Sequence, residues 1–440
     1  MSIKVGLVSL GCAKNRVDSE VLLGLLRDNG YELVADPAEA DYIFVNTCGF
    51  IEAAKEESIG AIFEMAQFKE EGRLKKLFVT GCLTQRYPEA ILGEMPEVDG
   101  IMGVSDYSRL PEMIRAAEEG ERPACIADGE RFLKTRRILT TPAHTAYVKI
   151  SDGCSNRCAY CAIPMIRGPY RSRPYEDIIE ECRDLAAAGV TELVLIAQDT
   201  SRYGDDFPGG KRLLPQLLRD VSEIEGVRWV RVLYCYPDSA DDALLDEIAS
   251  NPKVAKYLDL PLQHIDDDML RSMNRRGDSK LIRKVIEGCR KRGILVRTTF
   301  IVGFPGETPE QFQKLLDFTK EAKFERMGAF AFSPEENTVA AEMDGQIDEE
   351  EKQLRLDQLM MLQQGVSMDY NEARIGEETE VVIDGRDEET GLYVARSMLE
   401  SPESDGVILI SSEEELETGA YMMVRITDAD AYDLYGEVIE

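Results

Sequence analysis

The chain has 440 residues, of which 44% are hydrophobic and 7% aromatic, which is typical of a folded protein of about three domains and excludes wholesale disorder. Its 51 basic and 83 acidic residues give a net charge of −32, which disfavours phosphate backbones and favours basic partners. No apolar run approaches the roughly 18 residues that a membrane helix needs, and the start MSIKVGLVSLGC predicts a buried strand rather than a signal peptide. We therefore expect a cytoplasmic protein with no membrane partner, whose ten cysteines are ligands or core residues rather than disulfides.

Strand-like and helix-like segments alternate over residues 1–135. The apolar runs KVGLVSLGC, YIFVNTCGF and KLFVTGC predict buried strands. Between the first two, DSEVLLGLLRDNG predicts a helix with Asp18 or Ser19 near its start and Gly30 beyond its end. Because this alternation builds parallel sheets, we expect an N-terminal α/β domain with a parallel sheet over these residues.

Each of the three predicted strands ends in a cysteine, namely Cys12, Cys48 and Cys82. The carboxyl ends of neighbouring strands in an open parallel sheet line one crevice, so these thiols can converge although they are far apart in sequence. Equivalent placement of three cysteines favours a metal cluster over coincidence. The alternative is three buried core cysteines, which are common. That is what we expect for the cysteines without comparable placement, Cys125, Cys235 and Cys289.

Residues 140–370 predict a second series of strands and helices. Its six strand candidates are AYVKIS, ELVLIAQD, WVRVLY, YLDLPL, VRTTFIVGF and RMGAFAF, separated by helical segments such as residues 175–189 and PEQFQKLLDFTKEA. Six βα units are too few to close an eight-fold barrel, so we expect a partial (β/α)6 barrel. The stretch IDEEEKQLRLDQLMMLQQGVSMDYNEA then predicts a long helix that leads out of the barrel.

The loop SDGCSNRCAYCAIP holds three cysteines, Cys154, Cys158 and Cys161. Structural zinc takes four ligands and disulfides take pairs, whereas the CxxxCxxC spacing can hold an iron–sulfur cube and leave one iron without a protein ligand. That open iron can chelate the amino and carboxylate groups of S-adenosylmethionine. The alternative is a zinc knuckle with a remote fourth ligand such as Cys182, whose helical surroundings favour a core position instead.

Polar residues and glycines recur at the ends of the predicted barrel strands, where barrel enzymes place their sites. They are Gln198, Asp199, Gln263, His264, Gly303 and Gly306. Their recurrence favours a cofactor site that includes Tyr160, Gln198, Gln263 and Gly303, although strand-end polar residues often only cap the next helix. His264 is one of two histidines, and a lone histidine is more often packed and hydrogen-bonded than catalytic. We assign no catalytic residue beyond the cysteines.

The pattern changes over residues 371–440 to short strands with turn residues between them, which predicts a small β-barrel. This part has twenty acidic residues against four arginines, a net −16. An RNA-binding barrel would show a basic stripe and exposed aromatics, whereas this charge suits a lysine- and arginine-rich protein. The basic runs KTRR, RGPYRSR and NRR can still contact phosphate. Arg167, Arg171 and Arg173 can equally orient a cofactor carboxylate or an acidic target side chain.

The cysteine loop, the strand before it and Tyr160 resemble the radical S-adenosylmethionine superfamily, which has a partial α/β barrel. With the N-terminal trio and the C-terminal barrel, essentially the whole chain resembles the methylthiotransferases, whose C-terminal module is the TRAM barrel. The resemblance implies two 4Fe-4S clusters, one on each cysteine trio, and two uses of S-adenosylmethionine. One donates a methyl group to a sulfur on the auxiliary cluster, drawn from sulfide or a persulfide. The other, with an electron from a low-potential donor, yields a 5′-deoxyadenosyl radical that abstracts hydrogen from the target carbon.

Several stretches resemble the ribosomal-protein branch of this family, which modifies an aspartate β-carbon of the small-subunit ribosomal protein S-twelve. They are SLGCAKNRVDSE, PLQHIDDDMLRSMNRRG and VARSMLESPESDGVI. One departure is Ala13, where the family often has proline, so the loop geometry beside Cys12 can differ slightly. The same-class alternative is methylthiolation of an adenosine in transfer RNA, which the acidic charge makes the less favoured partner. A different-class alternative is a non-catalytic, metal-stabilised scaffold that binds the ribosome.

Overall fold

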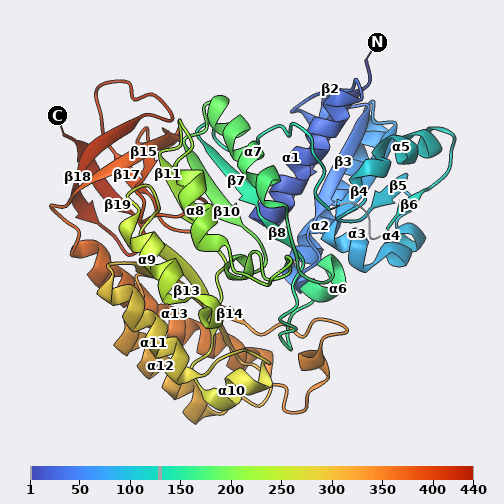
Figure 1. Cartoon of the computed structure of the whole chain (residues 1–440). Coiled ribbons are helices and arrows are strands. Elements are labelled where there is room, and N and C mark those ends of the chain that lie inside the picture. Colours follow the sequence, from blue (N-terminus) through green and yellow to red (C-terminus); the bar gives the residue numbers. More distant parts are fainter. Residues whose placement is uncertain (1, 127–130, 440) are drawn as a thin grey trace.

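The computed structural model describes residues 2–126 and 131–439 and shows three packed units along the chain (Figure 1). The N-terminal unit is a six-stranded, all-parallel sheet in the order β2-β1-β3-β4-β5-β6. Its elements are β1 (Lys4–Ser9), α1 (Ala13–Asp28), β2 (Glu32–Leu33), β3 (Tyr42–Thr47), α2 (Glu52–Glu71), β4 (Lys76–Gly81), α3 (Cys82–Arg86), α4 (Pro88–Glu94), β5 (Gly100–Met102), α5 (Leu110–Glu118) and β6 (Ala124–Cys125). The predicted parallel sheet and its three cysteine-terminated strands are therefore confirmed.

The first helix begins earlier than its sequence pattern predicts. We expected Asp18 or Ser19 near its start, but α1 begins at Ala13 with Cys12 as its extended N-cap. Asp18 and Ser19 are buried within the helix because they serve tertiary contacts rather than a cap; Ser19, for example, accepts a hydrogen bond from the Asn46 amide at 2.7 Å. Ala13 occupies the first helical position, where proline is well tolerated, so alanine there is compatible with the same helix start.

The central unit contains the six predicted barrel strands as two three-stranded parallel sheets, β11-β10-β7 and β12-β13-β14. The sheets adjoin where the Cys235 amide donates to the Asp259 carbonyl at 2.9 Å, which gives the partial barrel that the six-unit count predicts. The strands are β7 (Thr145–Lys149), β10 (Glu192–Ile196), β11 (Trp229–Val232), β12 (Tyr257–Gln263), β13 (Leu295–Val302) and β14 (Arg326–Ala331). The other elements are β8 (Ser151–Asp152), α6 (Ile163–Arg167), β9 (Arg171–Ser172), α7 (Tyr175–Ala187), α8 (Leu214–Ser222), α9 (Asp242–Ser250), α10 (Asp267–Ser272), α11 (Ser279–Lys291) and α12 (Pro309–Ala322).

The long helix α13 (Glu349–Glu372) packs back onto the barrel instead of simply leading out of it. Leu359 joins the apolar core of the barrel, and the Gln363 amide donates to the Phe324 carbonyl beside β14 at 2.9 Å. The helix covers the end of the β12-β13-β14 sheet because its buried side chains recur on one face. None of the helices in the described ranges is both long and apolar enough to cross a bilayer.

The C-terminal unit is the predicted small barrel, closed in the order β15-β16-β17-β19-β18. Its strands are β15 (Glu378–Arg386), β16 (Tyr393–Arg396), β17 (Ile408–Ile410), β18 (Tyr421–Ala429) and β19 (Leu434–Val438). They lie on the far side of the central strands from the N-terminal sheet (Figure 1). Polar contacts hold the two barrels together: Arg396 forms a buried ion pair with Glu192 at 2.9 Å, and Nε2 of His144 lies within hydrogen-bond distance of Asp384 at 2.9 Å. The boundaries predicted near residues 135–140 and 370–371 stay predictions.

Helix α1 brings the N-terminal sheet against the inside of the partial barrel. Val17 of α1 packs in one apolar cluster with Tyr147, Val194 and Tyr257, which come from barrel strands. Near the start of the same helix the Lys14 ammonium lies 3.2 Å from the centre of the Tyr234 ring. The carboxyl ends of the N-terminal strands therefore face the mouth of the barrel, where the second cysteine loop lies.

Candidate active site: two cysteine trios joined by a buried arginine

The first cysteine trio lies in the loop between β8 and α6, at the mouth of the barrel. Cys154 and Cys158 are buried and Cys161 is half-buried. Backbone bonds shape the loop: the Cys161 amide donates to the Cys158 carbonyl at 3.0 Å, and the Cys154 amide donates to Gly168 at 3.1 Å. Burial raises the pKa of the Cys154 thiol to about 11 and also raises the pKa of Cys161, with Cys158 adding to both shifts. Thiolates this close repel one another, and a bound cation or cluster removes that repulsion.

Two donors surround the sulfur of Cys158. The Tyr236 hydroxyl lies 3.3 Å from Sγ, and Nη1 of Arg275 lies 3.6 Å from it. The guanidinium of Arg275 also stacks 4.1 Å from the centre of the Tyr236 ring. Arg275 belongs to the NRR run and is buried against this sulfur, so it does not offer a surface contact to phosphate. Both groups lie within hydrogen-bond distance of this sulfur.

A buried amide–carboxylate pair braces the cysteine loop from the end of β10. Nδ2 of Asn156 donates to Oδ2 of Asp199 at 2.8 Å, and the Ser201 hydroxyl donates to Oδ1 at 2.6 Å. Burial raises the pKa of the Asp199 carboxyl although both donors lower it. Asp199, predicted as a strand-end site residue, therefore positions the loop.

Two amide oxygens at strand ends test whether a cofactor fits beside this loop. Oε1 of Gln198, after β10, and Oε1 of Gln263, at the end of β12, are buried and find no hydrogen-bond partner among the described residues. Gln263 also holds a backbone φ of 72°, which a residue with a side chain adopts only when its surroundings enforce it. Buried acceptors are costly unless they receive a hydrogen bond, so donor groups of S-adenosylmethionine fit here.

The other residues predicted to bind the cofactor are placed differently. Tyr160 packs against the apolar cluster around Phe304 and Phe332, and burial, with Cys158 nearby, raises the pKa of its hydroxyl. Gly303 has a φ of 70°, and an added side-chain carbon would stand 2.4 Å from Lys352, so α13 accounts for this glycine. A carbon added to Gly306 would meet nothing within 4 Å.

The two histidines both have structural partners. His264 is fully buried; its Nε2 contacts Glu307 at 3.0 Å and its Nδ1 accepts from the Asp266 amide at 3.0 Å. His144 contacts Asp384 of the C-terminal barrel. The packed, hydrogen-bonded interpretation of His264 is therefore confirmed.

The second cysteine trio lies at the carboxyl ends of three adjacent strands. Cys12 follows β1, Cys48 follows β3, and Cys82 begins α3 directly after β4. A side-chain carbon added to Gly11, whose φ is 90°, would stand 3.5 Å from the Cys48 sulfur, so the turn before Cys12 lies against Cys48. Burial raises the pKa of the Cys82 thiol to about 12, with Cys12 and Cys48 contributing in the same direction. The thiols share one crevice, as their strand-end placement predicts; their role as ligands stays a prediction.

Asn15 joins the strand ends that form this crevice, a role that the sequence analysis did not predict. Its Nδ2 donates to the carbonyls of Leu10 and Thr47 at 2.7 and 3.0 Å, which joins the ends of β1 and β3. Its Oδ1 lies 3.8 Å from the sulfur of Cys82. The only available signal is its position three residues after Cys12 in SLGCAKN.

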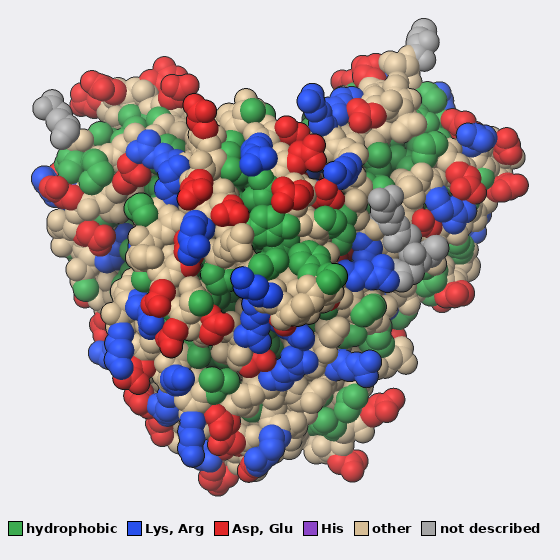
Figure 2. All heavy atoms as spheres, in the orientation of Figure 1, with side chains coloured by type: hydrophobic (Ala, Val, Ile, Leu, Met, Phe, Trp, Pro, Cys, Tyr) green, Lys and Arg blue, Asp and Glu red, His purple; other side chains and the backbone are tan. Residues whose placement is uncertain are grey.

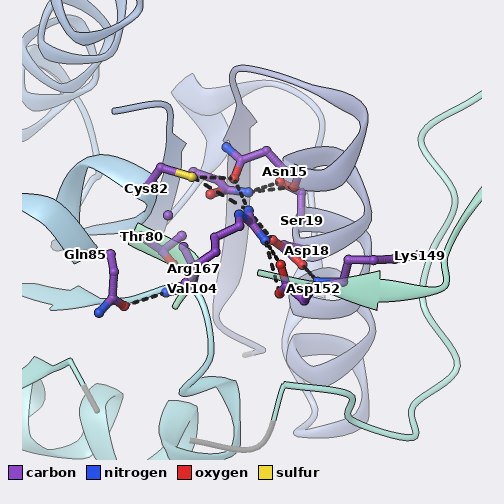
Figure 3. A network of polar contacts seen from close by, with 12 residues as sticks. Asn15, Asp18, Ser19, Thr80, Cys82, Gln85, Val104, Lys149, Asp152 and Arg167 are labelled. Atoms are coloured by element: carbon purple, nitrogen blue, oxygen red, sulfur yellow. Dashed lines mark hydrogen bonds and ion pairs between the residues drawn. The ribbon is translucent and has the colours of Figure 1, made fainter. Parts of the chain in front are cut away.

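Arg167 lies between Cys82 of the second trio and Asp152, which comes two residues before the first trio (Figure 3). It ends α6, directly after the first cysteine loop, and is 1% exposed. Its Nη2 lies 2.8 Å from Asp18 and 3.7 Å from the sulfur of Cys82, while Nη1 contacts both oxygens of Asp152 at 3.2 and 3.3 Å. Lys149 completes the network through ion pairs to Asp18 and Asp152. Arg167 is therefore buried and paired with carboxylates of this chain, and its expected role in orienting a cofactor carboxylate or an acidic target side chain stays a prediction.

The other two arginines of that run lie elsewhere. Arg173 pairs with Glu181 and donates to the Asp177 carbonyl at 3.3 Å, so it is engaged with α7. Arg171 is exposed on β9.

The chemistry of the donor sets, three thiols in each, suits iron–sulfur clusters. Within the described ranges no three His, Cys, Asp or Glu side chains are gathered tightly enough to hold one metal ion. A cube is larger than an ion, so its three thiolates stand further apart than the ligands of zinc. Cys182 is buried in the barrel core on α7, which disfavours the zinc knuckle. Each trio offers three free thiols, the number that a cube with one open iron requires.

Comparison with known proteins gives matches along the whole chain. Sequence profiles match over residues 4–103 (Uncharacterized protein family UPF0004), 148–319 (Radical SAM superfamily) and 375–439 (TRAM domain). A protein of Desulforamulus reducens named Ribosomal protein uS12 methylthiotransferase RimO is 49% identical over 442 residues, covering 99% of this chain and 99% of that protein. A Clostridium kluyveri protein of the same name is 46% identical, covering 100% and 98%.

A solved structure shares the fold at low sequence identity. The radical S-adenosylmethionine methyltransferase TsrM from Kitasatospora setae, with cobalamin and a [4Fe-4S] cluster bound, is 18% identical with a TM-score of 0.57. The similarity covers 77% of this chain and 74% of that chain, and at this identity it concerns the fold alone.

Proposed function

The chain belongs to the family of ribosomal protein uS12 methylthiotransferases, and we propose on this premise that it attaches a methylthio group to the β-carbon of an aspartate in uS12, the S-twelve protein of the small ribosomal subunit. It is an enzyme of the radical S-adenosylmethionine type. Because its proposed substrate belongs to the ribosome, we place it in the cytoplasm. The observation that carries the proposal is the convergence of two three-cysteine sites at the barrel mouth, linked through Arg167.

The two trios divide the labour in this proposal. Cys154, Cys158 and Cys161 would hold a 4Fe-4S cluster with one iron open to S-adenosylmethionine, which would supply 5′-deoxyadenosyl radical chemistry with an electron from a low-potential donor. Cys12, Cys48 and Cys82 would hold a second cluster, which would supply the methylthio sulfur, drawn from sulfide or a persulfide and methylated by another S-adenosylmethionine. A primary radical needs a dry site, and the buried walls of the barrel mouth provide it.

The residues around the first trio bind and orient in this scheme. The unpartnered amide oxygens of Gln198 and Gln263 accept hydrogen bonds from the cofactor. Tyr160 covers the loop on its apolar side. We retain Gly303 only as a backbone contact, because Lys352 fills the space beside its α-carbon. Asn156 and Asp199 hold the cysteine loop in place.

The charge of the C-terminal barrel supports a basic protein as substrate. Its loop between β17 and β18 exposes Glu413, Glu414, Glu415 and Glu417. The face seen in Figure 2 carries interspersed acidic and basic side chains, with acidic ones at the outer end of this barrel. The acidic loop attracts a lysine- and arginine-rich protein and repels phosphate backbones, so methylthiolation of transfer RNA is not favoured. A non-catalytic scaffold is not favoured either, because the chain belongs to a family of enzymes.

A competition experiment tests the proposal. Anaerobically reconstituted protein is incubated with S-adenosylmethionine, reductant and sulfide in the presence of both uS12 and bulk transfer RNA, and both are then analysed by mass spectrometry. The expected result is a methylthio mass gain on an aspartate-containing peptide of uS12. A gain only on RNA would contradict the proposed substrate. Parallel incubation with isolated small subunits distinguishes free uS12 from the assembled particle as the form that is modified.

A further inference from the structure

The charged side chain of Arg167 contacts both a cysteine of the second trio and the segment that leads into the first trio. It touches Cys82 on one side, and on the other it pairs with Asp152, which lies two residues before Cys154. The mechanism proposed above gives it no task. A buried guanidinium is costly unless its partners satisfy it, so its placement against a sulfur requires an explanation.

The charges around Arg167 are arranged by sign. Its guanidinium faces the Cys82 sulfur at 3.7 Å, and the carboxylates of Asp18 and Asp152 contact the same guanidinium from other directions. Lys149 lies next to both carboxylates. Arg167, Lys149, Asp18 and Asp152 form a network of two cations and two carboxylates, and the charge of Arg131 also acts on Asp152. Of these charged side chains, Arg167 contacts the Cys82 sulfur.

We propose that Arg167 sets the reduction potential of the cluster held by Cys12, Cys48 and Cys82, and that Asp18 and Asp152 moderate its effect. This inference rests on the proposed function, because it requires a cluster at the second trio. A positive hydrogen-bond donor at a ligand sulfur stabilises the reduced, more negative state of the cluster and so raises its potential. The negative carboxylates of Asp18 and Asp152, which contact the same guanidinium, offset part of this stabilisation. Arg167 is thus a positioning and tuning residue that acts through Cys82.

The tuning has a consequence for the reaction. A cluster that carries sulfur must keep its oxidation state while the neighbouring cluster is reduced. Its reduction potential, relative to that of the neighbouring cluster, decides which of the two takes up an electron first. Arg167 also pairs with Asp152 beside the first cysteine loop, so the residue that tunes one cluster is fixed by the segment that carries the other. Because Arg167 touches the Cys82 sulfur directly but reaches the first loop through Asp152, its substitution should alter the second cluster most and leave the first largely as it is.

The experiment isolates the second cluster. The variant C154A/C158A/C161A is reconstituted anaerobically and titrated electrochemically, with the reduced cluster followed by electron paramagnetic resonance. Adding Arg167→Gln should lower the midpoint potential, with about a tenfold change in the reduced-to-oxidised ratio at a fixed potential, or about 59 mV for one electron. Asp18→Asn, which removes a negative charge behind Arg167, should shift the potential in the opposite direction. Arg167→Lys should restore part of the wild-type value.

Controls separate tuning from loss of structure. Arg173→Gln removes an arginine from the same segment whose recorded partners are Glu181 and Asp177, so it should leave this potential unchanged. An unchanged potential in Arg167→Gln, or shifts of the same sign in Arg167→Gln and Asp18→Asn, would overturn the tuning role while the two-cluster proposal stands. A triple variant that retains no iron would overturn both.

Discussion

The guanidinium of Arg167 and the thiol of Cys82 are in contact, with Nη2 3.7 Å from Sγ, although 85 residues separate them in the chain. One residue belongs to the central barrel and the other to the N-terminal sheet. Their contact, with that of Lys14 on Tyr234, fixes the second cysteine trio at the barrel mouth. A reaction in which one site activates a carbon and the other delivers sulfur needs this fixed relationship.

Removal of the brace on the cysteine loop should weaken cluster retention. Asn156→Ala takes a donor from the buried Asp199 carboxylate, a loss of about 1–3 kcal/mol. We expect iron bound at the first trio to be lost to a chelator several-fold faster, as followed by the visible absorbance of the reconstituted protein. Ser201→Ala removes another donor to the same carboxylate but lies outside the loop, so its effect should be smaller. Equal rates in both variants would contradict a role for Asn156 in the loop.

The ion pair between the two barrels should contribute strongly to stability. Arg396→Met leaves the buried Glu192 with the Thr145 hydroxyl at 3.1 Å and the more distant Arg231 at 3.4 Å. It also removes the ion pair with Asp384, so the free energy of unfolding should fall by about 3–5 kcal/mol. Arg425→Met on the same small barrel removes an exposed pair with Glu378 and should cost at most about 1 kcal/mol. Urea unfolding of both apoprotein variants measures the difference. Similar losses of unfolding free energy in the two variants would show that the buried ion pair contributes no more to stability than the exposed one.

The buried Glu400 should make stability depend on pH. Burial alone would raise the pKa of its carboxyl, but Arg374 and Arg326, with the Ser397 hydroxyl, lower it to about 2. Because this is below the value of about 4.3 in an unfolded chain, the ionised carboxylate stabilises the fold above that pH. The stabilisation is lost as the pH falls toward 2, by roughly 2 kcal/mol between pH 6 and pH 3.

Glu400→Gln tests this dependence directly. The free energy of unfolding of the wild type minus that of the variant should be largest near pH 6 and shrink by that amount at pH 3. Urea titrations of both apoproteins at the two values give the double difference. A constant difference across this range would contradict the lowered pKa of Glu400.

The sequence predicts most of this architecture because its strands are buried apolar runs and its cysteines stand at their ends. The six barrel strands, the closed C-terminal barrel and the crevice of Cys12, Cys48 and Cys82 follow from local patterns. The start of α1 does not, because Gly11 and Cys12 form the helix entry while Asp18 is used by Arg167. Local patterns report burial and turns; they carry no signal for which buried charges pair across the chain.

An ion pair between Arg86 of the N-terminal unit and Glu335, which follows the last barrel strand, clamps the two units together and should couple the two cysteine sites. Glu335 is 2% exposed and pairs with Arg86 at 2.8 Å, while Arg86 also donates to the Gly49 carbonyl beside Cys48 at 2.9 Å. Glu335→Gln weakens this clamp, so we expect at least a twofold rise in 5′-deoxyadenosine formed per methylthiolated product. Chromatography of both products measures the ratio. The exposed Glu342→Gln serves as the control, and an equal ratio in both variants would argue against the clamp.

The division of labour between the trios is the central claim, and the triple variant C12A/C48A/C82A tests it most directly. It should retain about four irons, the content of one cube, against about eight in the wild type. The decisive measurement is the simultaneous quantification of 5′-deoxyadenosine and of methylthiolated uS12 after anaerobic incubation with S-adenosylmethionine and reductant. The account predicts that 5′-deoxyadenosine still forms while methylthiolated uS12 is absent. Methylthiolated uS12 from this variant would contradict the assignment of the sulfur-carrying cluster to Cys12, Cys48 and Cys82.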